Sequence, residues 1–211
     1  RADKVVVVSE YWKNVMEKAG CSDVEVIYNS FDLELFRFNS SELQSLKQRL
    51  NLSEHKPLIY LGNARPDKGF LDSYQSLKDL EATFVATGKN EHSDQLPVRT
   101  FYLSYKNYLR ILKLSTLAIT MSVFDEGWCR TAHEAMLCGT PVVGSGRGGM
   151  QELLEKGGQV ICQDFSLLDR VVKSLLSDKK KRDEMSRKGR EFASRFNLDY
   201  FREKFLALVS F

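Results

Sequence analysis

The stretch LAITMSVFDEGWCRTAHEAMLCGTPVVGSGRGGMQELLE, residues 117–155, decides the fold of this chain. It contains two short apolar runs, residues 117–121 and 141–144, with the length and β-branched content of buried strands. Between them, residues 131–138 carry apolar side chains at helical spacing, and Gly139 is typical of a helix C-terminus. The stretch therefore predicts two parallel strands joined by a helix.

Two glutamates in this stretch are candidate binding residues. Glu126 follows the first strand, and Glu134 lies in the helix after seven intervening residues. Open α/β sheets bind ligands at the carboxyl ends of their strands, where we expect Glu126 and the loop 144–149. A carboxylate can accept hydrogen bonds from both hydroxyls of a diol, such as those of a sugar or a ribose. The alternative is that Glu126 is a surface acid near a helix N-terminus and Glu134 a solvated helix residue.

Strand and helix patterns continue to alternate on both sides of this stretch. From Pro57 onward, apolar strand-like runs such as residues 58–62 and 83–87 are each followed by an amphipathic segment. Such alternation predicts an α/β fold with a doubly wound, Rossmann-like parallel sheet covered by helices on both faces.

Composition limits the class of protein. The 211 residues are 43% hydrophobic and carry a net charge of +3, so nothing demands a nucleic-acid partner. The basic run at residues 179–182 is followed by acids, which favours a solvated helix face over membrane or nucleic-acid contact. No apolar run approaches the roughly 20 residues of a membrane span. The chain lacks a signal peptide and opens without Met directly into a strand, so we expect a soluble fragment of a larger protein.

The cysteines are expected to be free thiols in a reducing compartment. None of the four, Cys21, Cys129, Cys138 and Cys162, has the spacing of a metal site.

The segment FDEGWCRTAHEAMLCGTPVV, residues 124–143, resembles the Glu-x7-Glu signature of the retaining glycosyltransferases of family 4. The following GRGGMQELLEKGG resembles that family's glycine turn. The resemblance implies the GT-B fold, with Glu126 and Gly127 at the donor sugar and Glu134 at the ribose of the nucleotide. It further implies that backbone N–H groups near Gly148 and Gly149 help to stabilise the diphosphate.

A second stretch, LGNARPDKGF at residues 61–70, follows a strand and precedes a helix. Cations placed there stabilise the charge that develops on a leaving nucleoside diphosphate. The resemblance assigns this role to Lys68, and Arg65 is a second candidate because of its charge. The alternative is that both belong to a basic surface turn. The family usually has Arg directly after Gly62, where this chain has Asn63, so Arg65 stands two places late.

The nucleotide base is the remaining part of the donor. Gly88 allows the backbone of the FVATGKN turn to approach a ligand, and the resemblance places backbone contacts to the base around Tyr102 and Leu103. The identity of the base stays open. His92 and His133 are interpreted as solvated and not catalytic, because the family's catalytic histidine belongs to the upstream domain.

The resemblance also divides the chain into three parts. Residues 1–38 are expected to be the tail of an N-terminal domain and its linker, residues 39–196 the donor-binding domain, and residues 197–211 a helix that crosses back. The linker resembles an Asn-x-x-Asp…Phe segment, here Asn29, Asp32 and Phe36.

The sequence therefore predicts a retaining, metal-independent glycosyltransferase that uses a UDP-, GDP- or ADP-hexose as substrate, without a cofactor. No Asp-x-Asp motif is present. The acceptor would be a sugar, a lipid or a protein. We expect a cytoplasmic protein, with a peripheral contact at the inner membrane surface left open. The sequence does not predict the oligomeric state.

Three alternatives stay open. One is a non-catalytic nucleotide-sugar binding module, and another is a sugar-nucleotide epimerase. The third is a dinucleotide-binding domain, because Gly144, Gly146 and Gly149 form G-x-G-x-x-G and Asp164 follows about 20 residues later. Against the third, the next helix is short and the loop comes late in the sheet.

Overall fold

The computed structural model describes residues 4–88 and 96–209 of the 211-residue chain. Strands and helices alternate through most of this part, as the sequence predicts. The strands are β1 (Val5–Val7), β2 (Val24–Val26), β3 (Leu58–Asn63), β4 (Thr83–Thr87), β5 (Arg99–Phe101), β6 (Leu117–Thr120), β7 (Val142–Gly144) and β8 (Val160–Ile161). The helices are α1 (Glu10–Lys18), α2 (Ser40–Arg49), α3 (Phe70–Leu77), α4 (Tyr105–Leu114), α5 (Arg130–Leu137), α6 (Gly149–Lys156), α7 (Phe165–Ser177), α8 (Lys179–Ala193) and α9 (Leu198–Val209), with 3-10 turns η1 (Leu33–Phe36) and η2 (Pro66–Lys68).

The main sheet is parallel and doubly wound, which confirms the predicted fold class. Among the described residues it has six strands in the order β5-β4-β3-β6-β7-β8, and every neighbouring pair is parallel. The chain moves outward from β3 to β5, returns to place β6 beside β3, and moves outward again to β8. The order of the strands therefore reverses between β3 and β6, and ligands bind at such a switch point in open α/β sheets.

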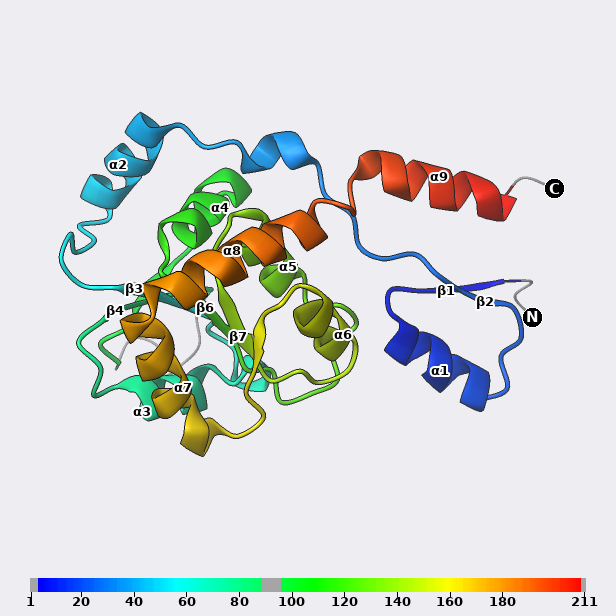
Figure 1. Cartoon of the computed structure of the whole chain (residues 1–211), viewed down its shortest axis with the longest axis horizontal. Coiled ribbons are helices and arrows are strands. Elements are labelled where there is room, and N and C mark those ends of the chain that lie inside the picture. Colours follow the sequence, from blue (N-terminus) through cyan, green and yellow to red (C-terminus); the bar gives the residue numbers. More distant parts are fainter. Residues whose placement is uncertain (1–3, 89–95, 210–211) are drawn as a thin grey trace.

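Helices cover both faces of this sheet (Figure 1). Leu58 and Tyr60 of β3 pack into one core with α4, α5 and α6, whereas Ile59 and Leu61 pack into a second core with α3 and α7. Successive strand residues point to opposite faces, so a strand buried on both sides must be apolar at every position. This requirement explains the uninterrupted apolar runs that the sequence shows.

A smaller unit lies to the side of the main sheet. Strands β1 and β2, which α1 connects, pair in parallel and form a second sheet at the right of Figure 1. Ser9 caps α1, as its Oγ accepts a hydrogen bond from the amide of Trp12. Two residues of the predicted linker, Phe31 and Phe36, are buried in the core of the main domain.

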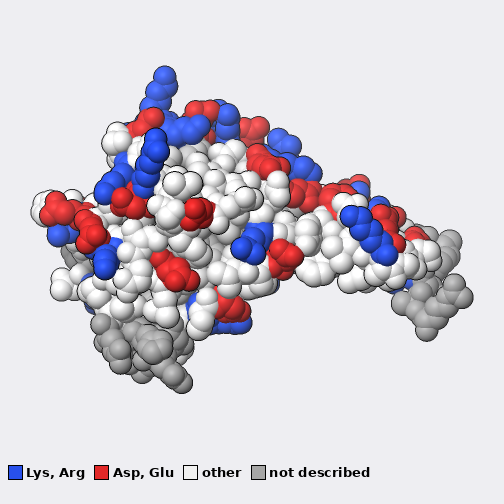
Figure 2. Space-filling view, turned by 90° about the horizontal axis from the view of Figure 1, so that it is seen from below, with Lys and Arg blue, Asp and Glu red and all other residues white. Residues whose placement is uncertain are grey.

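Charged side chains of both signs are interspersed on the face that Figure 2 shows. In the basic run at the start of α8, Lys179 forms an exposed pair with Asp183, and Arg182 donates to the carbonyl groups of Leu175 and Leu176. Within residues 4–88 and 96–209, no helix combines the length and apolar character needed to cross a bilayer.

Candidate donor-binding site

The switch point between β3 and β6 brings together two loops that are about 60 residues apart in sequence. After β3 the chain forms the turn η2, which ends at Gly69 with φ +65°. A Cβ atom at Gly69 would lie 2.1 Å from the carbonyl oxygen of Met121, which follows β6. Only glycine therefore allows this close approach, and it places Lys68 beside the loop that carries Glu126.

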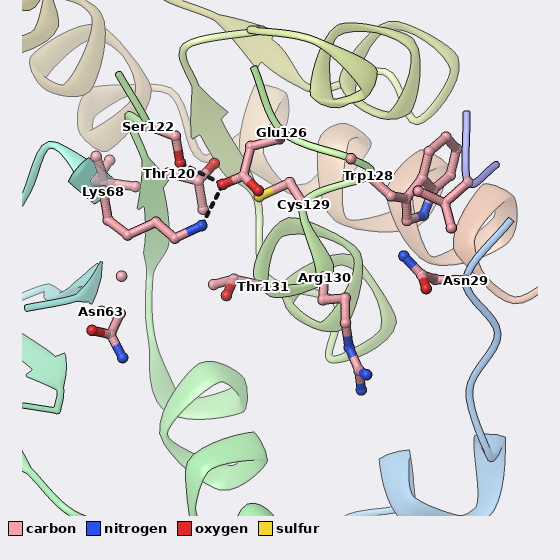
Figure 3. Close-up of a pocket in the computed structure, with 14 residues that line it drawn as sticks. Asn29, Asn63, Lys68, Thr120, Ser122, Glu126, Trp128, Cys129, Arg130 and Thr131 are labelled. Atoms are coloured by element: carbon pink, nitrogen blue, oxygen red, sulfur yellow. Dashed lines mark hydrogen bonds and ion pairs between the residues drawn. The ribbon is translucent and has the colours of Figure 1, made fainter. Parts of the chain in front are cut away.

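Lys68 and Glu126 form an ion pair at this point (Figure 3). Nζ of Lys68 lies 2.7 Å from Oε1 of Glu126, and Oγ of Ser122 donates to the same oxygen at 2.5 Å. The Glu126 side chain is 10% exposed and the Lys68 side chain 27% exposed. A partly desolvated pair of this kind needs further hydrogen bonds to be favourable, and Ser122 supplies one of them.

The glycine-rich loop fixes the backbone of Glu126 from behind. Glu126 forms a parallel bridge with Gly148, and the amide of Gly149 donates to the carbonyl of Glu126 at 2.8 Å. A Cβ atom at Gly149 would lie 1.9 Å from the carbonyl oxygen of Gly127. The third glycine of the G-x-G-x-x-G pattern, Gly149, is thus explained by packing against the Glu126 loop. Asp164, the acid that follows this glycine pattern in the sequence, caps α7 by accepting a hydrogen bond from the amide of Ser166.

A cavity of about 400 Å³ opens beside Lys68 and Glu126. In Figure 3, Asn63 and Lys68 lie on one side, and Trp128 and Asn29 on the other. The first turn of α5 also lines the cavity, and backbone N–H groups at such a helix N-terminus attract anions. The cavity therefore places a helix N-terminus and the Lys68 ammonium beside a carboxylate that can accept hydroxyl donors.

The residue before α5 is held in an unusual conformation. Cys129 is buried and adopts a left-handed backbone with φ 57°, which a residue other than glycine rarely does. Burial raises the pKa of its thiol to about 12, so the thiol is protonated at neutral pH.

A second cavity of about 490 Å³ adjoins the first, and the two share Asn63 and Thr131. Glu134 lies in its wall. The hydroxyl of Tyr105 donates to Oε1 of Glu134 at 3.0 Å, and the hydroxyl of Tyr108 donates to Oε2 at 2.7 Å. Burial raises the pKa of Glu134. The hydrogen bonds from the two phenols favour the carboxylate and partly offset this increase.

Most of the predicted site residues line these two cavities. The first is lined by Glu126, Lys68, Gly62, Asn63 and Gly127, and the second by Glu134, Asn63, Gly88, Tyr102 and Leu103. Gly148 and Gly149 instead lie behind the Glu126 loop, where the amide of Gly149 is already engaged.

Arg65, the second predicted cation beside Lys68, has a partner outside the two cavities. Its guanidinium pairs with Asp67, and its side chain is 60% exposed. Among the described residues, it is absent from the lining of both cavities.

The prediction that His133 is solvated was wrong. His133 is fully buried, accepts a hydrogen bond at Nδ1 from the indole of Trp128 at 2.8 Å, and donates from Nε2 to the carbonyl of Ala193 at 3.0 Å. Burial lowers its pKa to about 4, so the ring is neutral at pH 7. The helix α5 is buried on nearly all sides, and its polar residues therefore need partners inside the protein. The other histidine of that prediction, His92, lies outside the described residues.

Sequence reasoning missed several residues at the site, namely Ser122, Arg130, Tyr105 and Tyr108. One signal was available for the tyrosines: they stand three residues apart on an amphipathic helix and therefore share a face. No comparable pattern identifies Ser122. Within the described residues, no cluster of three or more His, Cys, Asp or Glu side chains is arranged to hold a metal ion.

Solved structures with the same fold include a glycosyltransferase and a protein in a complex with UDP-glucose. HepE from Anabaena, in a complex with UDP-glucose, superposes with a TM-score of 0.86 at 22% identity, over 100% of this chain and 64% of that one. WaaG, a glycosyltransferase involved in lipopolysaccharide biosynthesis, has a TM-score of 0.82 at 14% identity, over 98% of this chain and 62% of that one. The fold is the GT-B fold of these enzymes.

The sequence profile of the glycosyl transferases group 1 matches residues 44–192, which is more than half of the chain. The chain therefore belongs to this glycosyltransferase family.

Two relatives show the similarity at the level of sequence. Lipopolysaccharide 1,2-N-acetylglucosaminetransferase of Salmonella typhimurium is 27% identical, over 73% of this chain and 47% of its own length. N-acetyl-alpha-D-glucosaminyl L-malate synthase of Bacillus anthracis is 25% identical, over 80% of this chain and 48% of its own length. The chain thus spans about half the length of these relatives.

The free state of the cysteines is confirmed. Cys129, Cys138 and Cys162 are buried, Cys21 is half-buried, and all four are free thiols.

Proposed function

We propose that this chain is the donor-binding part of a retaining glycosyltransferase of family 4, which transfers a hexose from a nucleotide-diphosphate sugar to an acceptor hydroxyl without a metal ion. The observation that carries the proposal is the ion pair between Lys68 and Glu126 at the switch point, next to the cavity that contains Glu134. Family membership supports the transferase class, and the relatives' names support an activated sugar as substrate.

Each part of such a donor has a counterpart in the two cavities. Glu134 accepts hydrogen bonds from the ribose diol, and the backbone near Tyr102 and Leu103 lies at the base. The diphosphate lies at the first turn of α5, where N–H groups and Lys68 face it. Glu126 accepts hydrogen bonds from the hydroxyls of the sugar.

Lys68 and Glu126 change partners when the donor binds. Without a ligand, the ammonium and the carboxylate neutralise each other at 2.7 Å. The diphosphate draws the ammonium toward itself, and the carboxylate oxygen accepts a sugar hydroxyl in its place. As the glycosidic bond breaks, negative charge grows on the leaving diphosphate, so the lysine stabilises the transition state more than the ground state.

Retention follows in this proposal from attack of the acceptor hydroxyl on the face that the diphosphate leaves, without a protein nucleophile. The new glycosidic bond replaces the bond to the diphosphate, and the proton of the hydroxyl passes to an oxygen of the departing diphosphate. The acceptor is a sugar, a lipid or a protein, and the reaction takes place in the cytoplasm. Because two comparison proteins are named for N-acetylglucosamine transfer and for a UDP-glucose complex, UDP-hexoses are the first donors to test.

The test is a melting-temperature panel of UDP-, GDP- and ADP-sugars, followed by transfer assays of the full-length protein with and without a chelator. A ligand that binds only the folded state raises the melting temperature. We expect Glu126→Ala and Glu134→Ala to abolish transfer and keep the fold, and exposed Glu155→Ala to leave both unchanged.

Three results separate the alternatives. Binding of a nucleotide sugar without transfer to any acceptor would indicate a non-catalytic module. A change of sugar configuration without an acceptor would indicate an epimerase. An unchanged transfer rate in both glutamate variants would contradict the site.

A further inference from the structure

The first turn of α1 lies against the loop that carries Glu126. The indole N–H of Trp12 donates to the carbonyl oxygen of Glu126 at 3.0 Å, and the hydroxyl of Tyr11 donates to Oδ2 of Asp125 at 2.6 Å. Trp12 is half-buried, whereas the Tyr11 contact is exposed. The indole contact is therefore the less hydrated of the two, and it ends on the backbone of the residue proposed to bind the sugar.

The carbonyl oxygen of Glu126 is held from two directions. It accepts one hydrogen bond from the amide of Gly149 at 2.8 Å and the second from Trp12. A carbonyl oxygen has two lone pairs, so these two donors use its full capacity. The carbonyl carbon is bonded to Cα of Glu126, so both contacts restrict the backbone torsions that set the direction of the side chain.

Residues 4–29, which contain Trp12 and are called the α1 segment, also form part of the site. Val8 and Asn29 line the first cavity, and Figure 3 shows Asn29 on the side opposite Lys68. The same segment is attached at a second place, on α6, where Glu152 accepts hydrogen bonds from the amide of Glu10 at 3.1 Å and from the hydroxyl of Tyr28 at 2.5 Å. Hydrogen bonds thus attach the segment both to α6 and, directly, to the Glu126 loop.

We propose that Trp12 is a positioning residue for recognition of the donor sugar: its indole N–H holds the Glu126 backbone so that the carboxylate faces the cavity. The inference rests on the proposed role of Glu126 at the sugar hydroxyls. It couples the position of the α1 segment to sugar binding, while nucleotide binding at Glu134 and its tyrosines is independent of Trp12.

A purely structural role for Trp12 makes a different prediction. If the indole only attaches α1 to the main domain, its loss weakens binding of every ligand equally or lowers stability alone. If it positions Glu126, its loss selectively reduces the affinity that the sugar adds to the nucleotide.

The experiment compares Trp12→Phe with Tyr28→Phe in the full-length protein. Trp12→Phe keeps an aromatic ring and removes the N–H donor. Tyr28→Phe removes a hydrogen bond from the same segment to Glu152, which keeps its contacts with Glu10 and Lys156. The variant retains the aromatic ring that packs against Trp128. Dissociation constants are measured by calorimetry for UDP-glucose and for UDP, or for the pair that the melting panel selects.

We expect the ratio of the UDP to the UDP-glucose dissociation constant to fall about fivefold in Trp12→Phe, as for the loss of one neutral hydrogen bond. The ratio should stay at the wild-type value in Tyr28→Phe, and UDP affinity should stay unchanged in both variants. Unchanged UDP affinity also shows that the variants are folded.

An unchanged ratio in Trp12→Phe, or an equal fall in Tyr28→Phe, would overturn the role of Trp12 while leaving the proposed function intact. Equal losses for UDP and UDP-glucose would assign Trp12 a structural role only. A wild-type protein that binds no nucleotide sugar would reject the proposed function, and this inference with it.

Discussion

The hydroxyl of Tyr108 lies 2.7 Å from Oε2 of Glu134, and both residues are largely removed from water. Burial and the adjacent carboxylate raise the pKa of this phenol well above its ordinary value, so it remains a hydrogen-bond donor at any physiological pH. The carboxylate is thus oriented before a ligand arrives.

This relationship predicts the effect of Tyr108→Phe. A buried carboxylate oxygen that loses its donor is left partly unsatisfied, at a cost of about 1–3 kcal/mol in the free energy of unfolding. We also expect weaker UDP binding, since Glu134 would be less firmly oriented and more readily protonated. Urea unfolding and calorimetry measure the two effects. The hydroxyl of Tyr105 contacts the other oxygen of Glu134 at 3.0 Å from a less buried position. Tyr105→Phe should therefore have the smaller effect on stability and on UDP binding. The reverse order would contradict this assignment.

Lys68→Gln should weaken binding of UDP about 10- to 100-fold, because one charge-assisted hydrogen bond to the diphosphate is lost. Arg65→Gln is the matched control, since its guanidinium pairs with half-buried Asp67 and lines neither cavity. Calorimetry with UDP measures both variants. Comparable losses in the two would show that Arg65 reaches the diphosphate after all.

Buried His133 predicts a loss of stability in acid. Its pKa is about 4 in the folded protein and ordinarily near 6.5, so between these values the unfolded chain binds a proton that the native state does not. The contribution of neutral His133 to the free energy of unfolding is therefore complete above pH 6.5. It declines as pH falls toward 4, by about 3 kcal/mol in total.

The measurement is the pH dependence of urea unfolding for His133→Gln, with exposed His55→Gln as control. His133→Gln should be less stable than the wild type at pH 7, and the difference should narrow toward pH 4. A difference that stays constant with pH would show that His133 is not buried as the neutral ring.

Gly149→Ala should destabilise the protein and displace the Glu126 loop, because its Cβ atom would lie 1.9 Å from the carbonyl of Gly127 and 2.6 Å from Oγ of Ser9. Overpacking of this kind costs about 1–3 kcal/mol or more. Gly20→Ala is the control: φ is +89°, and a Cβ atom meets nothing within 4 Å. It should cost only the conformational strain, about 1–2 kcal/mol. Thermal unfolding compares the two, and a milder effect at Gly149 would contradict the packing seen here.

The sequence could predict the sheet and the edge where the site lies, because both follow from local patterns. A strand buried on both faces must be apolar at every position, so the continuous apolar runs indicate such strands. The residues after β3 and β6 then meet at the switch point. Glu126 and Lys68 could therefore be placed near each other without coordinates.

Side-chain partners could not be predicted in the same way. Whether Arg65 reaches a ligand depends on the direction of one turn, and in the structure Asp67, two residues away, binds its guanidinium. His133 is buried because α5 is covered by α8 as well as by the sheet, and its partner Ala193 lies 60 residues away in sequence. Such contacts arise from tertiary packing, which no local spacing encodes.

The distribution of the four thiols offers an experimental handle. The three buried cysteines belong to the main domain, and burial raises the pKa of each of their thiols, so maleimide reagents should leave them unmodified in the native protein. Cys21, directly after α1, is the more accessible thiol. A fluorophore attached there would report on the α1 segment from a single known position, without any engineered cysteine.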